Sequence, residues 1–192
     1  DADTLDALRY LYASPRVPRD AQLAEFARAA FKPGLPLLVA TRALMDLIFK
    51  TFTFDAKATE VSTPVHEVLK KKRGVCQDFA HLMIAALRST GIPARYMSGY
   101  LLTDPPPGKP RLIGADASHA WVAVWCPENG WVEYDPTNGI QPDVRHLTLG
   151  WGRDFQDVSP LRGVILGGLA QVPEVRVTVI PDGEKAVPRP AE

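Results

Sequence analysis

The spacing of apolar residues changes along the chain, from a helical period to an alternating one. Before residue 91, apolar positions recur every three or four residues, as on a helix with one buried face. This period predicts helices over 4–12, 20–31, 37–49, 63–73 and 76–90, with a short strand over 51–54. The third helix is apolar over most of its surface, so we expect it to be buried.

Beyond residue 91 the pattern alternates, as in half-buried strands. It predicts strands over 94–102, 119–125, 131–135 and 174–180, with another within 158–169. The Pro/Gly-rich stretch 103–116 is expected to be a loop long enough to cover a cleft, and 138–154 is expected to be irregular. Helices first and hairpin-linked strands later predict an α+β fold with an antiparallel sheet.

Boundary residues place the ends of these elements. Asp20 is suited to cap the second helix, and Ser62 or Thr63 the fourth. Gly91 and Pro93 end the helix that starts at Cys76. We therefore expect one domain over residues 1–180 and a polar, mobile tail over 181–192. Because the chain opens without Met, we expect it to be a fragment of a longer chain that lacks an N-terminal region.

Composition limits the classes of partner that we expect the chain to bind. The chain has 192 residues, 46% of them hydrophobic, and 22 basic residues balance 22 acidic ones. This balance favours neither nucleic acid nor a membrane surface as a partner, and no apolar run approaches the roughly 18 residues of a membrane span. Two cysteines are too few for a disulfide scaffold, so we expect a reduced, cytoplasmic setting.

Cys76 stands where the loop Arg73-Gly74-Val75 turns into an apolar-striped helix. Unpaired backbone N–H groups and the dipole at a helix start favour the thiolate over the thiol. The residues at helical spacing from Cys76 form one apolar face, which we expect to turn the sulfur toward the sheet: Phe79, Ala80, Met83, Ile84 and Leu87.

A base for that thiolate is expected from the strands. His119 shares one face of its strand with Trp121, and Asp135 lies one strand later. If the hairpin pairs residues of like parity, His119 and Asp135 lie on the same side of the sheet, and a slip of one residue separates them. Cys76 would then attack a carbonyl carbon, His119 would exchange the proton, and Asp135 would orient the imidazole.

Four segments together resemble the transglutaminase-like superfamily in its microbial branch. They are Gly74-Val75-Cys76, Gly91-Ile92-Pro93-Ala94-Arg95, His119-Ala120-Trp121, and Trp131 through Asp135-Pro136-Thr137. The resemblance implies a papain-like α+β core with the nucleophile helix packed on an antiparallel sheet. It also implies a catalytic triad of Cys76, His119 and Asp135 that acts on a peptide or protein substrate without a cofactor.

The resemblance leaves the reaction and the second oxyanion donor open. Lys70 stands six residues before Cys76, where papain-type enzymes have a Gln, so Gln77 and Trp121 are the candidates for the donor or the cleft wall. Peptidases, amidases and cross-linking enzymes share the family pattern, as do inactive relatives. The alternative hypotheses are a catalytically inactive scaffold for protein interaction and a Cys/His metal protein, although we predict no metal site.

The remaining residues of these types are expected to be structural. Cys126 lies in no comparable motif, and neither do the other three histidines, namely His66, His81 and His146.

Overall fold

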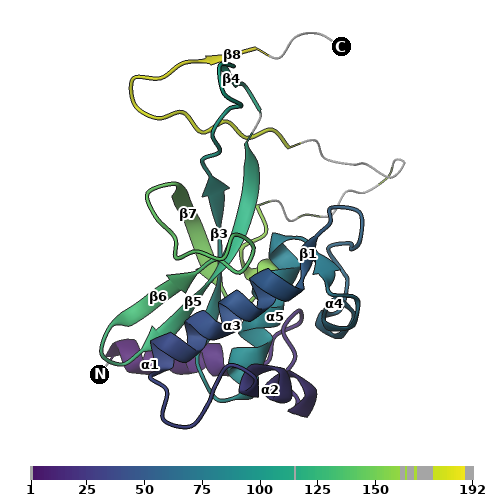
Figure 1. Ribbon diagram of the computed structural model, residues 1–192, viewed down its shortest axis with the longest axis vertical. Coiled ribbons are helices and arrows are strands. Elements are labelled where there is room, and N and C mark those ends of the chain that lie inside the picture. The colour runs from purple at the N-terminus through teal and green to yellow at the C-terminus, as the bar shows by residue number, and fades with distance from the viewer. Residues whose placement is uncertain (1, 115, 161–162, 164–166, 168–174, 189–192) are drawn as a thin grey trace.

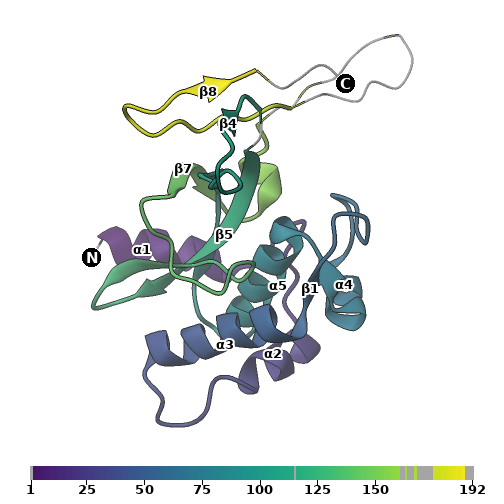
Figure 2. The same cartoon turned by 45° about the horizontal axis from the view of Figure 1, so that its top comes forward.

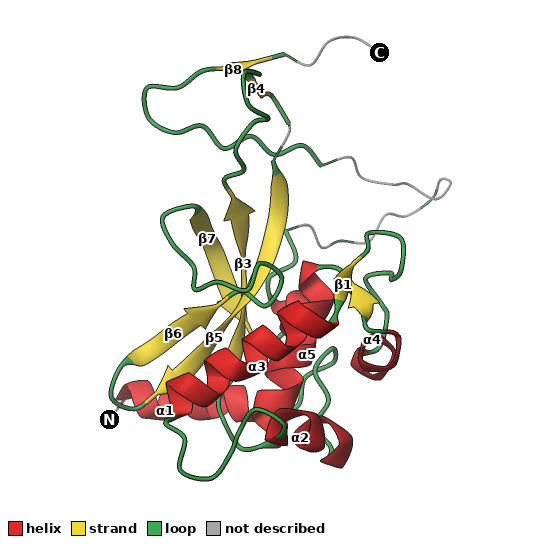
Figure 3. Ribbon diagram, in the orientation of Figure 1, coloured by secondary structure: helices red, strands yellow, loops and turns green. Residues whose placement is uncertain are grey.

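The computed structural model describes residues 2–114, 116–160, 163, 167 and 175–188. A four-stranded antiparallel sheet packs against helices, as Figures 1 and 3 show. The strand order is β6-β5-β3-β7, and the bounds are Ala94–Leu101 for β3, Ala117–Cys126 for β5, Gly130–Tyr134 for β6 and His146–Gly152 for β7. The α+β architecture predicted from the sequence is confirmed.

The central helix is α5, Cys76–Ser89. Its side chains from Asp78 to Arg88 are all buried, so the helix is enclosed on every side rather than on one apolar face. The predicted stripe is therefore correct but incomplete, because α2, α3 and α4 pack against α5 in addition to the sheet. Phe79, Met83 and Leu87 belong to the main core together with residues of β3 and β5.

Helices α2, Ala21–Arg28, α3, Leu37–Thr51, and α4, Val65–Lys71, pack against α5 (Figure 2). Helix α1, Ala2–Leu8, continues as a 3-10 turn over Arg9–Leu11, which contacts β3. Asp20 caps α2 as predicted, since its carboxylate accepts the Leu23 N–H at 3.0 Å. The predicted Ser62 or Thr63 cap of α4 is wrong, because Pro64 occupies that position without a side-chain hydrogen bond.

Helix α3 is buried on one side only. Leu44, Met45 and Ile48 are fully buried, whereas Val39 and Phe49 are about half exposed. The expectation of a wholly buried helix is wrong, since apolar residues on its outer face stay in contact with solvent.

Side chains from the two faces of the sheet belong to two separate hydrophobic clusters. Residues Ala120, Val122 and Val124 of β5 face the core around α5, while Trp121 and Ala123 form a second cluster with Met97. Strands β5 and β6 pair Ala123 with Glu133 and Trp125 with Trp131. Residues of like parity therefore pair, as the site requires. His119 has the parity of Trp121.

Strand β7 lies in the stretch that we expected to be irregular. It pairs antiparallel with β3, and the register shifts between Ser98 and Gly99. The pattern Leu147, Leu149, Trp151 alternates with smaller residues, and these three side chains are partly exposed along the sheet edge. The prediction for 138–154 is wrong over His146–Gly152, because an edge strand alternates without burying its apolar positions.

Four short strands form two further pairs among the described residues. Thr53–Phe54 (β1) pairs in parallel with Arg73–Gly74 (β2), just before α5. Within the predicted loop 103–116, Arg111–Leu112 (β4) pairs with Ala186–Val187 (β8), so the predicted tail contains a strand. In the range 174–180, Val177 forms only an isolated bridge with Asp116, and most of 158–169 lies outside the described residues.

None of the described helices is long and apolar enough to cross a membrane.

Candidate active site

Cys76 is the first residue of α5, and Asp78 fixes the turn that presents it. The Asp78 carboxylate accepts the backbone N–H of Val75 at 2.8 Å and the hydroxyl of Thr59 at 2.6 Å, and its residue is 3% exposed. A Cβ at Gly74 would lie 2.6 Å from the same carboxylate, so only glycine fits there. Local packing thus sets where the helix begins and leaves the thiol partly exposed.

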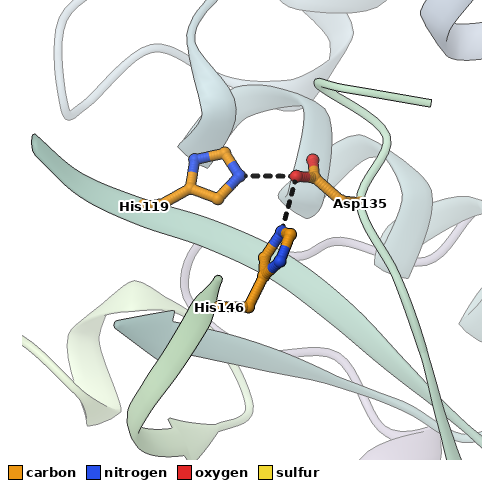
Figure 4. A group of neighbouring side chains, drawn as sticks. All are labelled: His119, Asp135 and His146. Atoms are coloured by element: carbon orange, nitrogen blue, oxygen red, sulfur yellow. Dashed lines mark hydrogen bonds and ion pairs between the residues drawn. The ribbon is translucent and has the colours of Figure 1, made fainter. Parts of the chain in front are cut away.

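His119 and Asp135 meet in a buried contact, shown in Figure 4. His119 Nε2 lies 2.7 Å from Asp135 Oδ2, with side-chain exposures of 8% and 0%. The two residues come from β5 and from the turn directly after β6, which the like-parity register places on one side of the sheet. The structure therefore brings together two of the three residues predicted from the sequence.

Cys76 also reaches His119. Burial by itself would lower the pKa of His119, but hydrogen bonds with Asp135 and with Cys76 outweigh that effect and raise the pKa to about 9. Since Asp135 engages Nε2, the ring nitrogen left for Cys76 is Nδ1. His119 is therefore protonated near neutral pH.

The carboxylate of Asp135 is held from several directions. Its Oδ1 accepts the backbone N–H groups of Thr137 and Asn138 at 2.9 and 3.2 Å. Its Oδ2 also accepts the Asn138 side-chain amide at 2.7 Å. Burial would raise the pKa of Asp135, but hydrogen bonds from His119, His146 and Asn138 hold it well below its usual range. Asp135 is thus a fixed anion in contact with the imidazole of His119.

His146, predicted to be merely structural, lies in the site as well. Its Nε2 is 3.1 Å from Asp135 Oδ2, and its side chain is 1% exposed. Figure 4 shows both imidazoles directed at the same carboxylate oxygen. Sequence reasoning missed His146 because it missed β7, although the alternating pattern after it was available as a signal.

Trp121 and Gln77, the predicted oxyanion or cleft residues, have other partners. Trp121 is fully buried and donates its indole N–H to Glu133 at 2.7 Å, so that group is not free to meet an oxyanion. Its ring is stacked beside His119 at a centroid distance of 6.0 Å. The Gln77 amide donates to the Val61 carbonyl at 3.2 Å. A donor role for either residue stays a prediction, and Trp121 acts here as a wall that supports the histidine.

The three residues His119, Asp135 and His146 also have the ligand types of a metal site. Their nearest donor atoms all lie within 4.8 Å of one another. The two oxygens of Asp135 already accept five hydrogen bonds, from both histidines, from the Asn138 side chain and from two backbone N–H groups. A carboxylate offers about four lone-pair positions, so hydrogen bonding accounts for this geometry and a cation would have to displace existing donors.

The other predicted structural residues lie apart from these contacts. His81 is buried and accepts the Phe155 N–H at 3.1 Å, and burial lowers its pKa to about 4. His66 contacts the Asp20 carboxylate at 2.7 Å. Cys126 is buried and donates to Asn129 at 3.2 Å. Of the four histidines, only His119 and His146 contact Asp135.

The family model described as "Transglutaminase-like superfamily" matches residues 24–136, more than half of the chain and the segment that holds Cys76, His119 and Asp135. The chain belongs to the transglutaminase-like superfamily. The resemblance in the four sequence motifs is thereby confirmed at the level of the family.

Two curated proteins illustrate the sequence similarity of this chain to other proteins. An uncharacterised protein of Mycobacterium tuberculosis strain H37Rv is 48% identical over 162 residues, which are 82% of this chain and 52% of that protein. A "Protein-glutamine gamma-glutamyltransferase" of Pseudomonas aeruginosa is 32% identical over 127 residues, 66% of this chain and 19% of that protein. The chain thus spans about half the length of the mycobacterial relatives it matches.

Solved structures show the same transglutaminase-like fold. A "putative cysteine protease" from Cytophaga hutchinsonii superposes with a TM-score of 0.68 at 27% identity, over 80% of this chain and 49% of that one. The periplasmic domain of TgpA from Pseudomonas aeruginosa, bound to ethylmercury, superposes with a TM-score of 0.51 at 26% identity, over 71% of this chain and 50% of that one. The papain-like, transglutaminase-like core predicted from the motifs is confirmed.

Proposed function

We propose that the protein catalyses cysteine-dependent acyl transfer on an amide or peptide substrate, through a triad of Cys76, His119 and Asp135. The observation that carries the proposal is the position of His119. Its Nε2 lies 2.7 Å from Asp135 Oδ2, and Cys76 is close enough to contribute to the raised pKa of the imidazole. A thiol, an imidazole and a carboxylate in series are the parts that nucleophilic catalysis at a carbonyl needs.

The steps follow from the protonation of the resting site. The Cys76 thiolate attacks the amide carbonyl carbon and forms a C–S bond, and the carbonyl π electrons move to oxygen. As the C–N bond breaks, protonated His119 gives its proton to the leaving amine, so that a thioester remains on Cys76. Water or a second amine then attacks the thioester, loses a proton to His119 and releases Cys76 as the thiolate.

The developing oxyanion lies at the start of α5. The backbone N–H of Cys76 is in the first helical turn, where N–H groups have no intrahelical acceptor. Where measured in other enzymes, removal of one such donor costs about 3–4 kcal/mol of transition-state stabilisation. We propose this N–H as one oxyanion donor.

Hydrolysis and amine transfer differ only in what attacks the thioester. The name of the Pseudomonas relative supports transfer of a glutamine acyl group to an amine. The description of the Cytophaga structure supports proteolysis. We propose both as candidate reactions of this chain on a peptide or protein substrate. A cytoplasmic setting stays a prediction.

An assay with three readouts tests the proposal. The protein is incubated with a glutamine-rich, unfolded protein and a fluorescent primary amine, and incorporated amine, released ammonia and new peptide termini are measured together. We expect at least one of these signals in the wild type and in Cys126→Ala, and none in Cys76→Ala or His119→Ala. Equal signals in the wild type and Cys76→Ala would exclude the mechanism.

The alternative, an inactive scaffold for protein interaction, predicts no signal in any of these channels. It also predicts an ordinary thiol at Cys76. The contact between Cys76 and a protonated His119 favours the enzyme over the scaffold, because a scaffold has no need to keep a buried charge beside a thiol.

A further inference from the structure

His146 is a buried polar residue that the proposed triad leaves without a role. It opens β7, and its side chain is 1% exposed. Burying an imidazole is unfavourable unless it is hydrogen-bonded. Its partners therefore indicate what it does.

Hydrogen bonding assigns the position of the proton on the His146 ring. Nδ1 lies 3.4 Å from the backbone N–H of Asp143 and 3.6 Å from the Asp143 carboxylate. Nε2 lies 3.1 Å from Asp135 Oδ2, and an ionised carboxylate only accepts hydrogen bonds, so Nε2 carries a proton. His146 therefore donates to the same oxygen that His119 contacts.

The ring of His146 is fixed by its surroundings. Strand pairing places His146 opposite Leu101 of β3. The indole of Trp121 packs against it edge-on, with ring centroids 5.3 Å apart at 78°. The same indole stacks beside His119. One buried tryptophan thus supports both histidines, and each histidine contacts the carboxylate between them.

We propose that His146 is a positioning residue that holds the Asp135 carboxylate in the orientation in which it binds His119. The inference rests on the triad function proposed above. Oδ2 accepts one hydrogen bond from each of His119, His146 and Asn138. Without the His146 donor, Oδ2 is directed only by His119 and the Asn138 amide, and the short contact with His119 weakens as the carboxylate shifts. Partners one layer behind a reacting group commonly fix its geometry in this way.

The titration of His119 tests this inference without any assay of turnover. The ring resonances of His119 are followed by NMR against pH in the wild type, His146→Phe and His146→Gln. The glutamine amide nitrogen takes nearly the position of imidazole Nε2, so this variant keeps the donor. We expect the pKa of His119 to fall by about one unit or more in His146→Phe, a tenfold weaker proton affinity, and to stay near the wild-type value in His146→Gln.

Two further variants keep the test decisive. His146→Asn places its amide too far from Asp135 and should lower the pKa of His119 even if the phenylalanine does not fold. His66→Phe removes another histidine–aspartate contact, that of His66 Nε2 with Asp20, and should leave the pKa of His119 unchanged. An unchanged or raised pKa in folded His146→Phe or His146→Asn would overturn the positioning role.

Kinetics separate this inference from the proposed function. If the protein transfers acyl groups, His146→Phe should lower kcat about tenfold or more with little change in KM, and His146→Gln should restore much of the loss. In an Asp135→Asn background, His146→Phe should have little further effect, because the two residues act through one contact. If no variant shows turnover but the pKa of His119 still falls, the proposed function fails and the positioning role stands.

Discussion

Gly99 on β3 pairs directly with His119 on β5, and on its other side it pairs with Thr148 of β7. A Cβ at Gly99 would lie 2.0 Å from the Leu147 carbonyl oxygen and 2.8 Å from the Trp121 ring. The missing side chain is what lets β7 approach β3 at the register shift beside Ser98. His146 is brought to the site by that approach, so one glycine connects the sheet geometry with the contacts around Asp135.

We expect Gly99→Ala to be strongly destabilising. The nearest clash is with backbone, which cannot move aside as a flexible side chain can, so overpacking should cost about 1–3 kcal/mol or more. Chemical denaturation measures the loss of unfolding free energy. Gly163→Ala is the matched control, because a Cβ there has nothing within 4 Å. Equal stability of the two variants would show that β7 does not depend on close approach at Gly99.

Asp78 should affect both stability and the reactivity of Cys76. Asp78→Ala removes the acceptor for the Val75 N–H and the Thr59 hydroxyl at the start of α5. Loss of a helix cap typically costs about 0.5–2 kcal/mol, and the thiol should lose its fixed position beside His119. Denaturation and iodoacetamide labelling at Cys76 are the measurements. Asp78→Asn keeps an acceptor oxygen and should lie between wild type and Asp78→Ala, whereas a reversed order would contradict the capping role.

Arg88 joins the end of α5 to three other segments. Its guanidinium is fully buried and donates to the carbonyls of Ala94, Tyr12 and Arg153 at 2.7 to 3.1 Å. We expect Arg88→Met to lower the unfolding free energy by about 3 kcal/mol, because buried carbonyl groups lose their donors. Arg28→Met is the control, since that exposed side chain has only a surface pair with Glu25, worth about 0–1 kcal/mol. Similar losses in both variants would contradict this account.

The stability of the protein should fall as pH rises above about 6.5. The pKa of His119 is about 9 in the folded protein, against about 6.5 in an unfolded chain. Between these values the folded state binds more protons than the unfolded state, so its stabilisation is complete below pH 6.5 and lost by about pH 9. The contribution of His119 is at most about 3 kcal/mol.

Urea denaturation at intervals from pH 6 to 9.5 measures this dependence. His119→Gln should show a clearly smaller decline than the wild type across that window. Parallel curves would mean that His119 has no raised pKa, and the charge pairing with Asp135 and Cys76 would then be in doubt.

Much of the fold was predictable because its signals are local. The change from helical to alternating spacing placed α5, β3 and β5 within a few residues, and the Asp20 cap was correct. The hairpin register was left open by the sequence, because a slip of one residue fits the same alternation, and the structure pairs residues of like parity. Strand β7 was missed because its apolar residues Leu147, Leu149 and Trp151 stay partly exposed at an edge, where alternation is weak evidence for burial.

The site residues that lie in sequence motifs could be predicted, whereas those brought together only by the packing of distant segments could not. The pairing of His119 with Asp135 was implied by the family resemblance, whereas strand parity allowed it only if the hairpin had the register that the structure shows. His146 could not be found this way, because its contact with Asp135 requires the bulge beside Gly99 and the β3–β7 pairing. The engagement of the Trp121 indole by Glu133 likewise depends on cross-strand packing that single-residue patterns do not report.

The most direct test of the central claim is the rate of alkylation of Cys76 at pH 6.5, measured by mass spectrometry of the labelled peptide in wild type and His119→Ala. Buried Cys126 serves as the internal reference within each sample. Because a protonated His119 favours the thiolate, we predict alkylation of Cys76 at least tenfold faster in the wild type than in His119→Ala. Equal rates in the two folded proteins would contradict the thiolate–imidazolium pair on which the proposed acyl transfer depends.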